Sequence, residues 1–345
     1  MLRLLILFGG ESPEHDVSNI SASNILKELD CNKYEITKLG ITKDGKWFLV
    51  DDSCSLDEIK SGTWTNKVTF PAHISPSKER KGVIVLKENS YEFIPIDVCF
   101  PVLHGSNGED GIIQALLQLA GIKRVGADCL SSAMAMDKAV SKTMFEKAGV
   151  PVVPAIYLSK NDNREDLLSK ISLPVFVKPA NAGSSVGCSK VFTEKELAPA
   201  LENAFQIDSK VLVEEYIDCR EIECAVLGND DIFVSTPGEI STESEFYDFE
   251  TKYINTGANR LDIPANLPEE TITTIKNYAK KAFLALGLNG FSRVDFFVCK
   301  QTGKIYLNEI NTIPGFTAQS MYPLLMKNEG IAYGELLDRL IELAK

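Results

Sequence analysis

FSRVDFFV at residues 291–298 and LNEIN at residues 307–311 are the two stretches that decide the fold of this 345-residue chain. Each is an apolar run that carries two polar side chains two positions apart. Side chains at i and i+2 of a β-strand point to the same face. Arg293 and Asp295 therefore share a face of the first strand, and Glu309 and Asn311 share a face of the second. The pattern predicts two strands, each with one polar face.

These strands bring oxygen ligands together if they are neighbours. Asp295, Glu309 and the side-chain oxygen of Asn311 would then form an all-oxygen cluster, which suits Mg²⁺ beside nucleotide phosphates. Arg293 could stabilise a negative charge that develops beside it. The alternative is a solvated strand face, but unpaired acids inside apolar strands would be costly. The sequence therefore favours a metal site here.

A loop rich in small residues follows an expected strand at Val175–Lys178. It runs from Pro179 to Gly187 and contains two glycines and two serines. Small residues let backbone N–H groups approach an anion closely, and Lys178 adds positive charge. The GxxxxGK[ST] pattern is absent, so this is not a Walker loop. The alternative is a plain turn.

The first third of the chain alternates strands with helices. The expected elements are strands Leu2–Phe8, Tyr34–Ile41 and Val98–Leu103 and helices at about 17–29 and 111–120. Alternation of this kind predicts a parallel sheet with helices on its faces. Residues 50–95 are polar and irregular, and we expect them to add edge strands.

We expect two further units in the remaining two thirds of the sequence, because a chain of 345 residues is too long for one hydrophobic core. We expect a small α+β lobe and then a larger unit with a long polar loop at about 236–260. The predicted division is 1–127, 128–217 and 218–345. The elements expected there are helices at about 138–148, 269–286 and 333–344 and strands at about 211–216, 291–298 and 304–310.

Composition excludes several classes of protein. The formal net charge is −12, which argues against a nucleic-acid partner because a phosphate backbone needs a basic patch. The eight cysteines are scattered without a CxxC pair, and there are three histidines, so a zinc site is not expected. No apolar run approaches about 18 residues, the length that spans a membrane. We expect a cytoplasmic protein with free thiols.

Polar residues also follow two strands of the first third. His104 comes directly after the strand that ends at Leu103, and Glu14 comes shortly after the first strand. Ligands favour the carboxyl edge of a parallel sheet, although a structural histidine and a helix-capping carboxylate are the alternatives. Gly315, in the turn after Pro314, could present a backbone N–H group or simply form the turn.

Seven segments together resemble the D-alanine–D-alanine ligase family within the ATP-grasp fold, over essentially the whole chain. They are FGGESPEHDVS at 8–18, LHGSNGEDG at 103–111, MDK at 136–138, FVKPANAGSSVG at 176–187, FYDFETKY at 246–253, SRVDFF at 292–297 and LNEINTIPGFTAQSMYP at 307–323. The resemblance implies a Rossmann-like N-terminal α/β domain followed by a two-lobed α+β ATP-grasp fold, with ATP between the two lobes.

The resemblance also assigns the nucleotide and metal residues. It implies that ATP is bound by Lys138, Lys178, Ser185, Glu214, Glu221 and Lys252. Among these, the two glutamates would hold adenine and ribose, and Lys252 would close over the γ-phosphate on a mobile loop. It implies two Mg²⁺ ions on Asp295, Glu309 and Asn311, with Mn²⁺ as an alternative ion and a monovalent cation left open.

The substrate residues follow from the same resemblance. Glu14 would bind the ammonium of the first D-alanine, with His104 nearby, and Tyr253, Ser184 and Glu14 would form the network that closes the loop. Arg293 and the N–H of Gly315 would form the oxyanion hole. Ser320 would bind the carboxylate of the second D-alanine. The implied product is D-alanyl-D-alanine for peptidoglycan precursors, formed through D-alanyl phosphate by a homodimer.

Two positions bear on the second substrate. Ligases of this family that make D-alanyl-D-lactate carry a histidine where this chain has Tyr253, and some serine-type enzymes carry an arginine where it has Met321. The apolar Met321 suits a methyl side chain, so D-alanine is favoured over D-serine, and D-lactate is disfavoured. Other ATP-grasp ligases lack the 246–253 segment. A non-catalytic regulator is disfavoured because Arg293, Asp295 and Glu309 are all retained.

Overall fold

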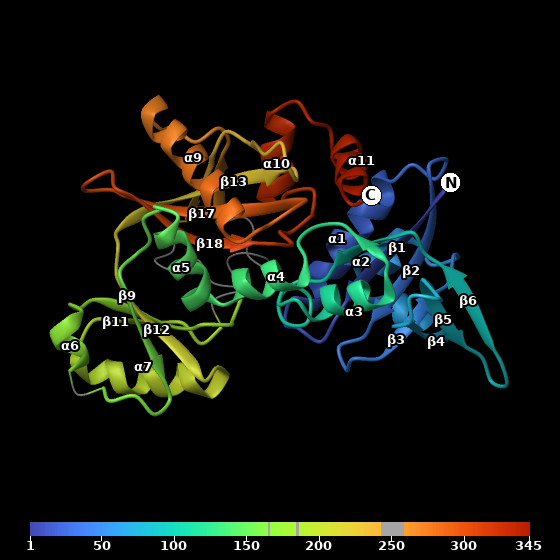
Figure 1. The fold of residues 1–345 in the computed structure, drawn as a ribbon, viewed down its shortest axis with the longest axis horizontal. Coiled ribbons are helices and arrows are strands. Elements are labelled where there is room, and N and C mark those ends of the chain that lie inside the picture. Colours follow the sequence, from blue (N-terminus) through green and yellow to red (C-terminus); the bar gives the residue numbers. More distant parts are fainter. Residues whose placement is uncertain (165, 184–185, 243–258) are drawn as a thin grey trace.

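The computed structural model describes residues 1–164, 166–183, 186–242 and 259–345. In these ranges the strands form three sheets. Figure 1 shows the N-terminal unit in blue, the central lobe in green and yellow, and the C-terminal unit in orange and red, which lies beside both. None of the helices in these ranges is long and apolar enough to cross a membrane.

The first sheet has eight strands in the order β6-β5-β4-β3-β2-β1-β7-β8. They are β1 (Leu2–Gly9), β2 (Tyr34–Ile41), β3 (Trp47–Val50), β4 (Val68–Ile74), β5 (Gly82–Leu86), β6 (Tyr91–Pro95), β7 (Val98–Val102) and β8 (Lys123–Arg124). Strands β2, β1, β7 and β8 are parallel, and β3 to β6 extend the sheet antiparallel. The expected parallel sheet and the expected edge strands are both confirmed.

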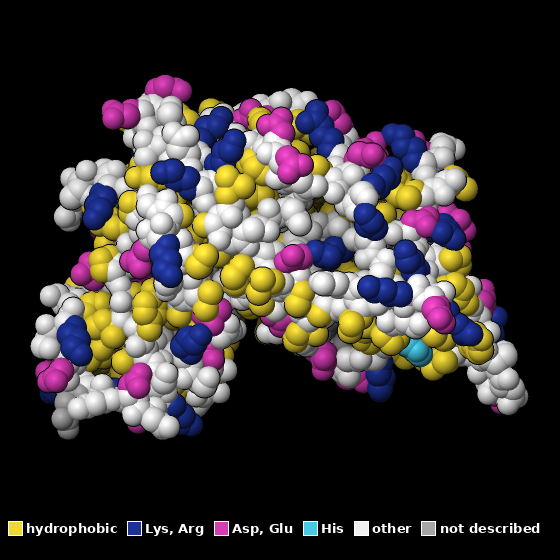
Figure 2. Space-filling model, in the orientation of Figure 1, with side chains coloured by type: hydrophobic (Ala, Val, Ile, Leu, Met, Phe, Trp, Pro, Cys, Tyr) yellow, Lys and Arg dark blue, Asp and Glu magenta, His cyan; other side chains and the backbone are white. Residues whose placement is uncertain are grey.

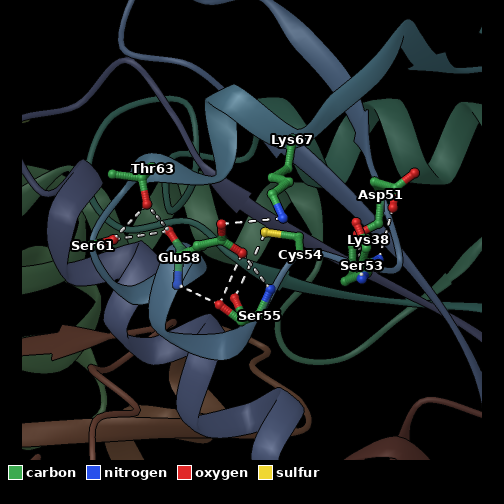
Figure 3. A network of polar contacts seen from close by, with 9 residues as sticks. All are labelled: Lys38, Asp51, Ser53, Cys54, Ser55, Glu58, Ser61, Thr63 and Lys67. Atoms are coloured by element: carbon green, nitrogen blue, oxygen red, sulfur yellow. Dashed lines mark hydrogen bonds and ion pairs between the residues drawn. The ribbon is translucent and has the colours of Figure 1, made fainter.

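Helices α1 (His15–Glu28), α2 (Leu56–Lys60) and α3 (Ile112–Ala120) connect these strands. The short helix α2 begins with a capping box, in which Ser55 Oγ accepts from the N–H of Glu58 and the Glu58 carboxylate accepts from the N–H of Ser55. Figure 3 shows this network, with Lys67 placed to pair with Glu58. Reciprocal capping explains why so short a helix forms.

The central lobe contains a four-stranded antiparallel sheet in the order β11-β10-β12-β9. Its strands are β9 (Ala155–Ser159), β10 (Val175–Pro179), β11 (Ser189–Val191) and β12 (Lys210–Glu215), and its helices are α6 (Leu167–Lys170) and α7 (Glu194–Ile207). The lobe has its own apolar core, which includes Val177, Leu201 and Val213.

The third sheet runs in the order β16-β15-β13-β17-β18, with β14 paired to β13. Its strands are β13 (Cys219–Leu227), β14 (Phe233–Val234), β15 (Gly238–Thr242), β16 (Asn259–Asp262), β17 (Phe291–Cys299) and β18 (Ile305–Asn311). The accompanying helices are α4 (Cys129–Met136), α5 (Lys138–Lys147), α9 (Glu269–Ala285), α10 (Met321–Asn328) and α11 (Tyr333–Leu343).

The expected loop at 236–260 needs correction at both ends. Residues 238–242 and 259–262 are the paired strands β15 and β16, and residues 243–258 lie outside the described part of the chain. Ile240 and Leu261 face each other in this pair of strands. These two apolar residues are outnumbered by polar neighbours, so the average composition of the segment indicated a loop. The sheet therefore extends into a segment that its composition assigned to a loop.

One apolar core joins the two ends of the chain. Leu4, Ile6 and Phe8 of β1 belong to the same cluster as Phe316 and Tyr322, and so do Leu336, Leu337, Leu340 and Ile341 of α11. Lys33 and Tyr34 also bond to Asp338 of α11, at 2.6 and 2.7 Å. The first and third units are thus packed on each other through shared side chains, and the central lobe has a separate core.

Candidate active site

A cavity of about 820 Å³ lies where the three units meet. Its lining comes from segments far apart in the sequence, including Glu14, His104, Lys138, Gly183 and Arg293. The C-terminal unit contributes β17, β18 and the segment from Thr312 to Met321. A volume of this size accommodates a nucleotide tail and small organic substrates.

The polar pairs of β17 and β18 lie side by side, which meets the condition that the predicted metal site required. The two strands are antiparallel neighbours, with Asp295 opposite Glu309 and Arg293 opposite Asn311. Asn311 Nδ2 donates to Asp295 Oδ2 at 2.9 Å. Two carboxylates and an amide therefore share one face of the sheet, and Glu309 and Asn311 line the cavity. Because the amide can present its oxygen after rotation, this donor set fits Mg²⁺.

Arg293 is held by carboxylates on two strands. Its Nε and Nη2 donate to the two oxygens of Asp295, both at 2.7 Å. Its Nε also lies 2.9 Å from Glu223 Oε2 on β13. The pairing fixes the plane of the guanidinium at the cavity wall. Glu223, opposite Asp295 in the β13–β17 register, was missed from the sequence, although it repeats the i, i+2 pattern with Glu221.

A buried ion-pair cluster lies where the central lobe meets α5. Glu214 Oε1 is 2.7 Å from Lys142 Nζ, and Glu214 Oε2 is 2.6 Å from Lys178 Nζ. The side chains of Lys142 and Glu214 are 1% and 2% exposed. Burial alone would raise the pKa of Glu214, but the two ammonium groups outweigh it and lower this pKa to about 2. Burial lowers the pKa of Lys142.

Lys178 and Glu214 thus lie together as the resemblance implies, whereas Lys142 was missed. Lys142 lies four residues after Lys138 on the same helix. This spacing did not identify it, because lysines so spaced are common on the solvent-exposed face of a helix. Lys138 reaches from the start of α5 towards the cavity. Its Nζ donates to the carbonyl of Ala182 at 2.7 Å and lies 3.6 Å from Glu309 Oε2.

Glu14 lies against two loops that carry expected motifs. A Cβ added to Gly105 would come within 2.6 Å of Glu14 Oε2, and one added to Gly183 would lie 3.6 Å from the same atom. Glu14 is buried, and its N–H donates to Ser12 Oγ at 3.1 Å. The glycines of both loops therefore leave room for this carboxylate.

His104 is buried with both ring nitrogens engaged by protein groups. Nδ1 lies 3.0 Å from the carbonyl of Ile313, and Nε2 lies 3.2 Å from Ser21 Oγ. Burial lowers the pKa of His104, so the ring is neutral and Nδ1–H donates to Ile313. Glu109, missed from the sequence, lies beside it. Burial, reinforced by the charge of Glu14, raises the pKa of Glu109 to about 8.

The far end of the cavity contains the turn after Pro314. Ser320 Oγ accepts from the N–H of Thr317 at 3.0 Å and lies 2.8 Å from Thr317 Oγ1. A Cβ on Gly315 would approach Ser320 Oγ to 2.9 Å, so a side chain at this position would displace the Ser320 hydroxyl. Met321 lines the cavity and is 4% exposed. These expected residues lie together at one wall.

Four expected site residues lie outside the described part of the chain: Ser184, Ser185, Lys252 and Tyr253. Glu221 is described and lies on β13, two positions before Glu223 and opposite Phe297 of β17. It therefore lies on the same face of the sheet as Glu223 and Arg293.

Known proteins match this chain over nearly its whole length. The family model described as D-ala D-ala ligase N-terminus matches residues 3–127, and the one described as D-ala D-ala ligase C-terminus matches residues 144–342. A D-alanine--D-alanine ligase of Acetivibrio thermocellus is 50% identical over 99% of this chain and 95% of its own length. One of Caldicellulosiruptor bescii is 47% identical over the same shares.

Two solved structures also match this chain over nearly its whole length. The VanG D-Ala:D-Ser ligase from Enterococcus faecalis has a TM-score of 0.91 and 38% identity, covering 100% of this chain and 99% of that one. The D-alanine-D-alanine ligase from Coxiella burnetii has a TM-score of 0.86 and 37% identity, covering 99% and 93%.

Proposed function

The chain belongs to the D-alanine–D-alanine ligase family, and we propose that it joins two D-alanine molecules into D-alanyl-D-alanine, converting ATP to ADP and phosphate. The observation that carries this proposal is the polar cluster of Arg293, Asp295, Glu309 and Asn311 on β17 and β18. Arg293, Glu309 and Asn311 of this cluster line the shared cavity. The product serves peptidoglycan precursor synthesis. The family match over both halves of the chain supports the substrate class.

ATP binds between the central lobe and the third sheet. Lys138 and Lys178 contact its phosphates, together with Ser185 and Lys252, and Glu214 and Glu221 contact adenine and ribose. The buried cluster around Glu214 supports this placement, because a carboxylate held there by two lysines can accept from an adenine amino group. Asp295, Glu309 and Asn311 hold two Mg²⁺ ions, which when bound neutralise phosphate charge. Mn²⁺ can replace them, and a monovalent cation would be additional.

The first step makes an acyl phosphate. Glu14 binds the ammonium of the first D-alanine and directs its carboxylate towards the γ-phosphate of ATP. A carboxylate oxygen attacks phosphorus, the bond to ADP breaks, and D-alanyl phosphate forms. The protein contributes position and charge rather than a covalent intermediate of its own.

The second step forms the peptide bond. Ser320 binds the carboxylate of the second D-alanine, whose deprotonated amine attacks the acyl carbon. Negative charge then develops on the carbonyl oxygen, where Arg293 and the N–H of Gly315 donate hydrogen bonds. The C–O bond to phosphate breaks and the dipeptide forms. Ser184, Tyr253 and Glu14 close the segment around 246–253 over the site and exclude water.

D-alanine is the second substrate because Met321 presents an apolar surface to its side chain. D-serine is the second candidate, since the VanG D-Ala:D-Ser ligase matches the whole chain. The relatives named D-alanine--D-alanine ligase reach 50 and 47% identity, against 38% for that structure, which supports D-alanine.

The larger organisation is also part of the proposal. In this division residues 1–127 are the first-substrate domain, 128–217 the central ATP-grasp lobe, whose helices α4 and α5 pack on the third sheet, and 218–345 the catalytic domain. The chain works as a homodimer in the cytoplasm. Exposed apolar side chains on α3 and α4 support self-association; they are Ile112, Leu119 and Leu130, at 58, 62 and 66% exposure. Figure 2 shows apolar surface in this region.

The proposal is tested by supplying Mg-ATP with D-alanine, then adding D-serine or D-lactate, and identifying the products by mass. We expect D-alanyl-D-alanine to dominate in every mixture, with ADP formed in equal amount. Dominance of D-alanyl-D-serine would overturn the interpretation of Met321. Failure of D-alanine to elicit ADP would overturn the substrate class.

A further inference from the structure

Ile313 is held at both of its backbone polar groups by the N-terminal unit. Glu109 Oε1 accepts from the N–H of Ile313 at 3.1 Å, and His104 Nδ1 donates to its carbonyl at 3.0 Å. We call this arrangement the Ile313 clamp. Its two side chains follow β7, whereas Ile313 follows β18, so the clamp joins two sheets at the cavity.

The clamp is connected to the first-substrate side. The second oxygen of Glu109, Oε2, accepts from the N–H of Gly105 at 2.8 Å. Gly105 in turn lies against the Glu14 carboxylate, which a Cβ at that position would meet at 2.6 Å. Ser12 adds a second path, because its hydroxyl donates to the His104 carbonyl at 2.6 Å and accepts from the N–H of Glu14.

The clamp is also connected to the reaction centre. Ile313 lies two residues after Asn311 and two residues before Gly315. Ser21 contacts Phe316, the residue after Gly315. Its hydroxyl accepts from the N–H of Phe316 at 3.2 Å and lies 3.2 Å from His104 Nε2. The segment 311–316, which carries both a metal ligand and an oxyanion donor of the proposed mechanism, is therefore fixed from the N-terminal side.

We propose that Glu109, acting with His104, is a positioning residue that couples occupancy of the first-substrate site to the placement of segment 311–316. This inference rests on the proposed function, because the roles of Glu14 and Gly315 come from it. Glu109 lines the cavity, and the bonds that it accepts are to backbone N–H groups of the protein. It acts through the backbone of Ile313, so that the oxyanion donor is aligned when the first D-alanine is in place.

Electrostatics give the coupling its direction. The groups that act on Glu109 are Glu14, Arg293 and the N–H groups of Gly105 and Ile313; burial and the charge of Glu14 raise its pKa, and the others lower it. An ammonium group bound at Glu14 offsets that repulsion. Glu109 then carries more negative charge, and a charged carboxylate accepts N–H bonds more strongly than a neutral acid. The first substrate thus tightens the clamp.

Glu109→Gln is the decisive variant, and Asp110→Asn is its matched control. Gln retains one acceptor oxygen and places an amide nitrogen where the second acceptor was. Asp110 also accepts two backbone N–H bonds, from Asn107 at 2.7 Å and Ile112 at 3.1 Å, but both lie in its own loop and helix. The control therefore loses the same kind of contact without affecting the clamp.

We expect E109Q to lower kcat for dipeptide formation at least tenfold, with the KM for ATP unchanged within twofold, because small misplacements of reacting groups are costly. D110N should change both parameters less than twofold. An E109Q kcat within twofold of that of D110N would overturn the inference. If E109Q does not fold, Glu109→Asp, which shortens the reach by one methylene, carries the same expectation.

Amide hydrogen exchange of the ligand-free proteins tests the clamp independently of product formation. Exchange in segment 311–316 should be at least tenfold faster in E109Q than in wild type and unchanged in D110N, and D-alanine should slow it in wild type and D110N but not in E109Q. Equal exchange in all three proteins would overturn the clamp. Absence of dipeptide from wild type would instead overturn the proposed function, and the exchange comparison would still decide the clamp.

Discussion

At the scale of single residues, Arg293 carries the most chemistry, because its guanidinium is held at the cavity wall by Asp295 and Glu223. We predict that Arg293→Ala lowers kcat for dipeptide formation by about 10²–10³-fold, the usual cost of an oxyanion donor. Arg220, which forms a comparable pair with Glu239 on the same sheet outside the cavity lining, provides the control. Steady-state kinetics should show R220A within a few-fold of wild type.

Lys142 has a role in stability as well as in the nucleotide site. Replacing it with methionine leaves Glu214 with one buried partner, and breaking a buried pair typically costs about 3–5 kcal/mol. Urea unfolding should detect this loss. Arg339→Ala, which breaks the exposed pair with Glu335, should cost under about 1 kcal/mol. Equal losses in the two variants would contradict the buried cluster.

Glu109 makes stability depend on pH in a defined window. Its pKa is raised from 4.5 to about 8 in the folded protein, so the folded state binds the proton more tightly than the unfolded state. The resulting stabilisation is complete below about pH 4.5 and is lost as the pH rises through 8. Urea midpoints from pH 6 to 9 should fall more steeply in wild type than in E109Q; identical slopes would show that the raised pKa is wrong.

The metal-site residues could be predicted from the residues alone because they lie on strands in a pattern that each strand reveals by itself. The i, i+2 rule was enough for Arg293 and Asp295. Glu109 and Lys142 were missed because their functions depend on partners distant along the chain, and nothing local distinguishes them from a loop acid or a solvated helix lysine.

At the scale of elements, the loop from His104 to Gly111 connects a strand end to the cavity. Gly105 has a φ of +71° and faces Glu14, whereas Gly303 has a φ of +68° and nothing within 4 Å of an added Cβ. Alanine at either site costs about 1–2 kcal/mol in the left-handed region. We predict that Gly105→Ala additionally displaces Glu14 and raises the KM for D-alanine about tenfold, and that Gly303→Ala leaves it unchanged. Equal KM values would contradict the contact with Glu14.

Elements with one clear period were predicted well. Strand β2 was located to the residue, and helices α5 and α9 within a residue at their ends. Helix α7 was missed although its apolar residues have helical spacing, because Pro199 lies inside it and argues against a helix. Strand β13 was missed because its cavity face carries Glu221 and Glu223, which make a central strand look like a polar loop.

At the scale of the whole molecule, the shared core of β1 and α11 makes the first and third units one cooperative body. We predict that Leu340→Ala, a fully buried change costing about 2–5 kcal/mol, speeds amide exchange in both of these units. Val177→Ala should affect the central lobe alone, because its core is separate. Exchange that spreads from Val177 into β1 would contradict this division of cores.

The sequence predicted three units, and it did not predict this union of the chain ends. Periodicity in β1 and in α11 shows that each has an apolar face, and it contains no information about which faces meet. The cavity could not be predicted from the sequence for the same reason. Its lining includes Glu14, Gly183 and Arg293 from different units, and only the packing of these units brings them together.

The most direct test of the account follows the oxygen atoms of the first substrate. D-alanine labelled with ¹⁸O in its carboxylate is supplied with Mg-ATP, and the released phosphate is analysed by mass spectrometry. An acyl phosphate intermediate requires that each phosphate released with dipeptide carries one ¹⁸O atom from D-alanine, and we predict this result. Unlabelled phosphate would show that ATP is cleaved without attack by the substrate carboxylate, and would contradict the proposed chemistry of the site.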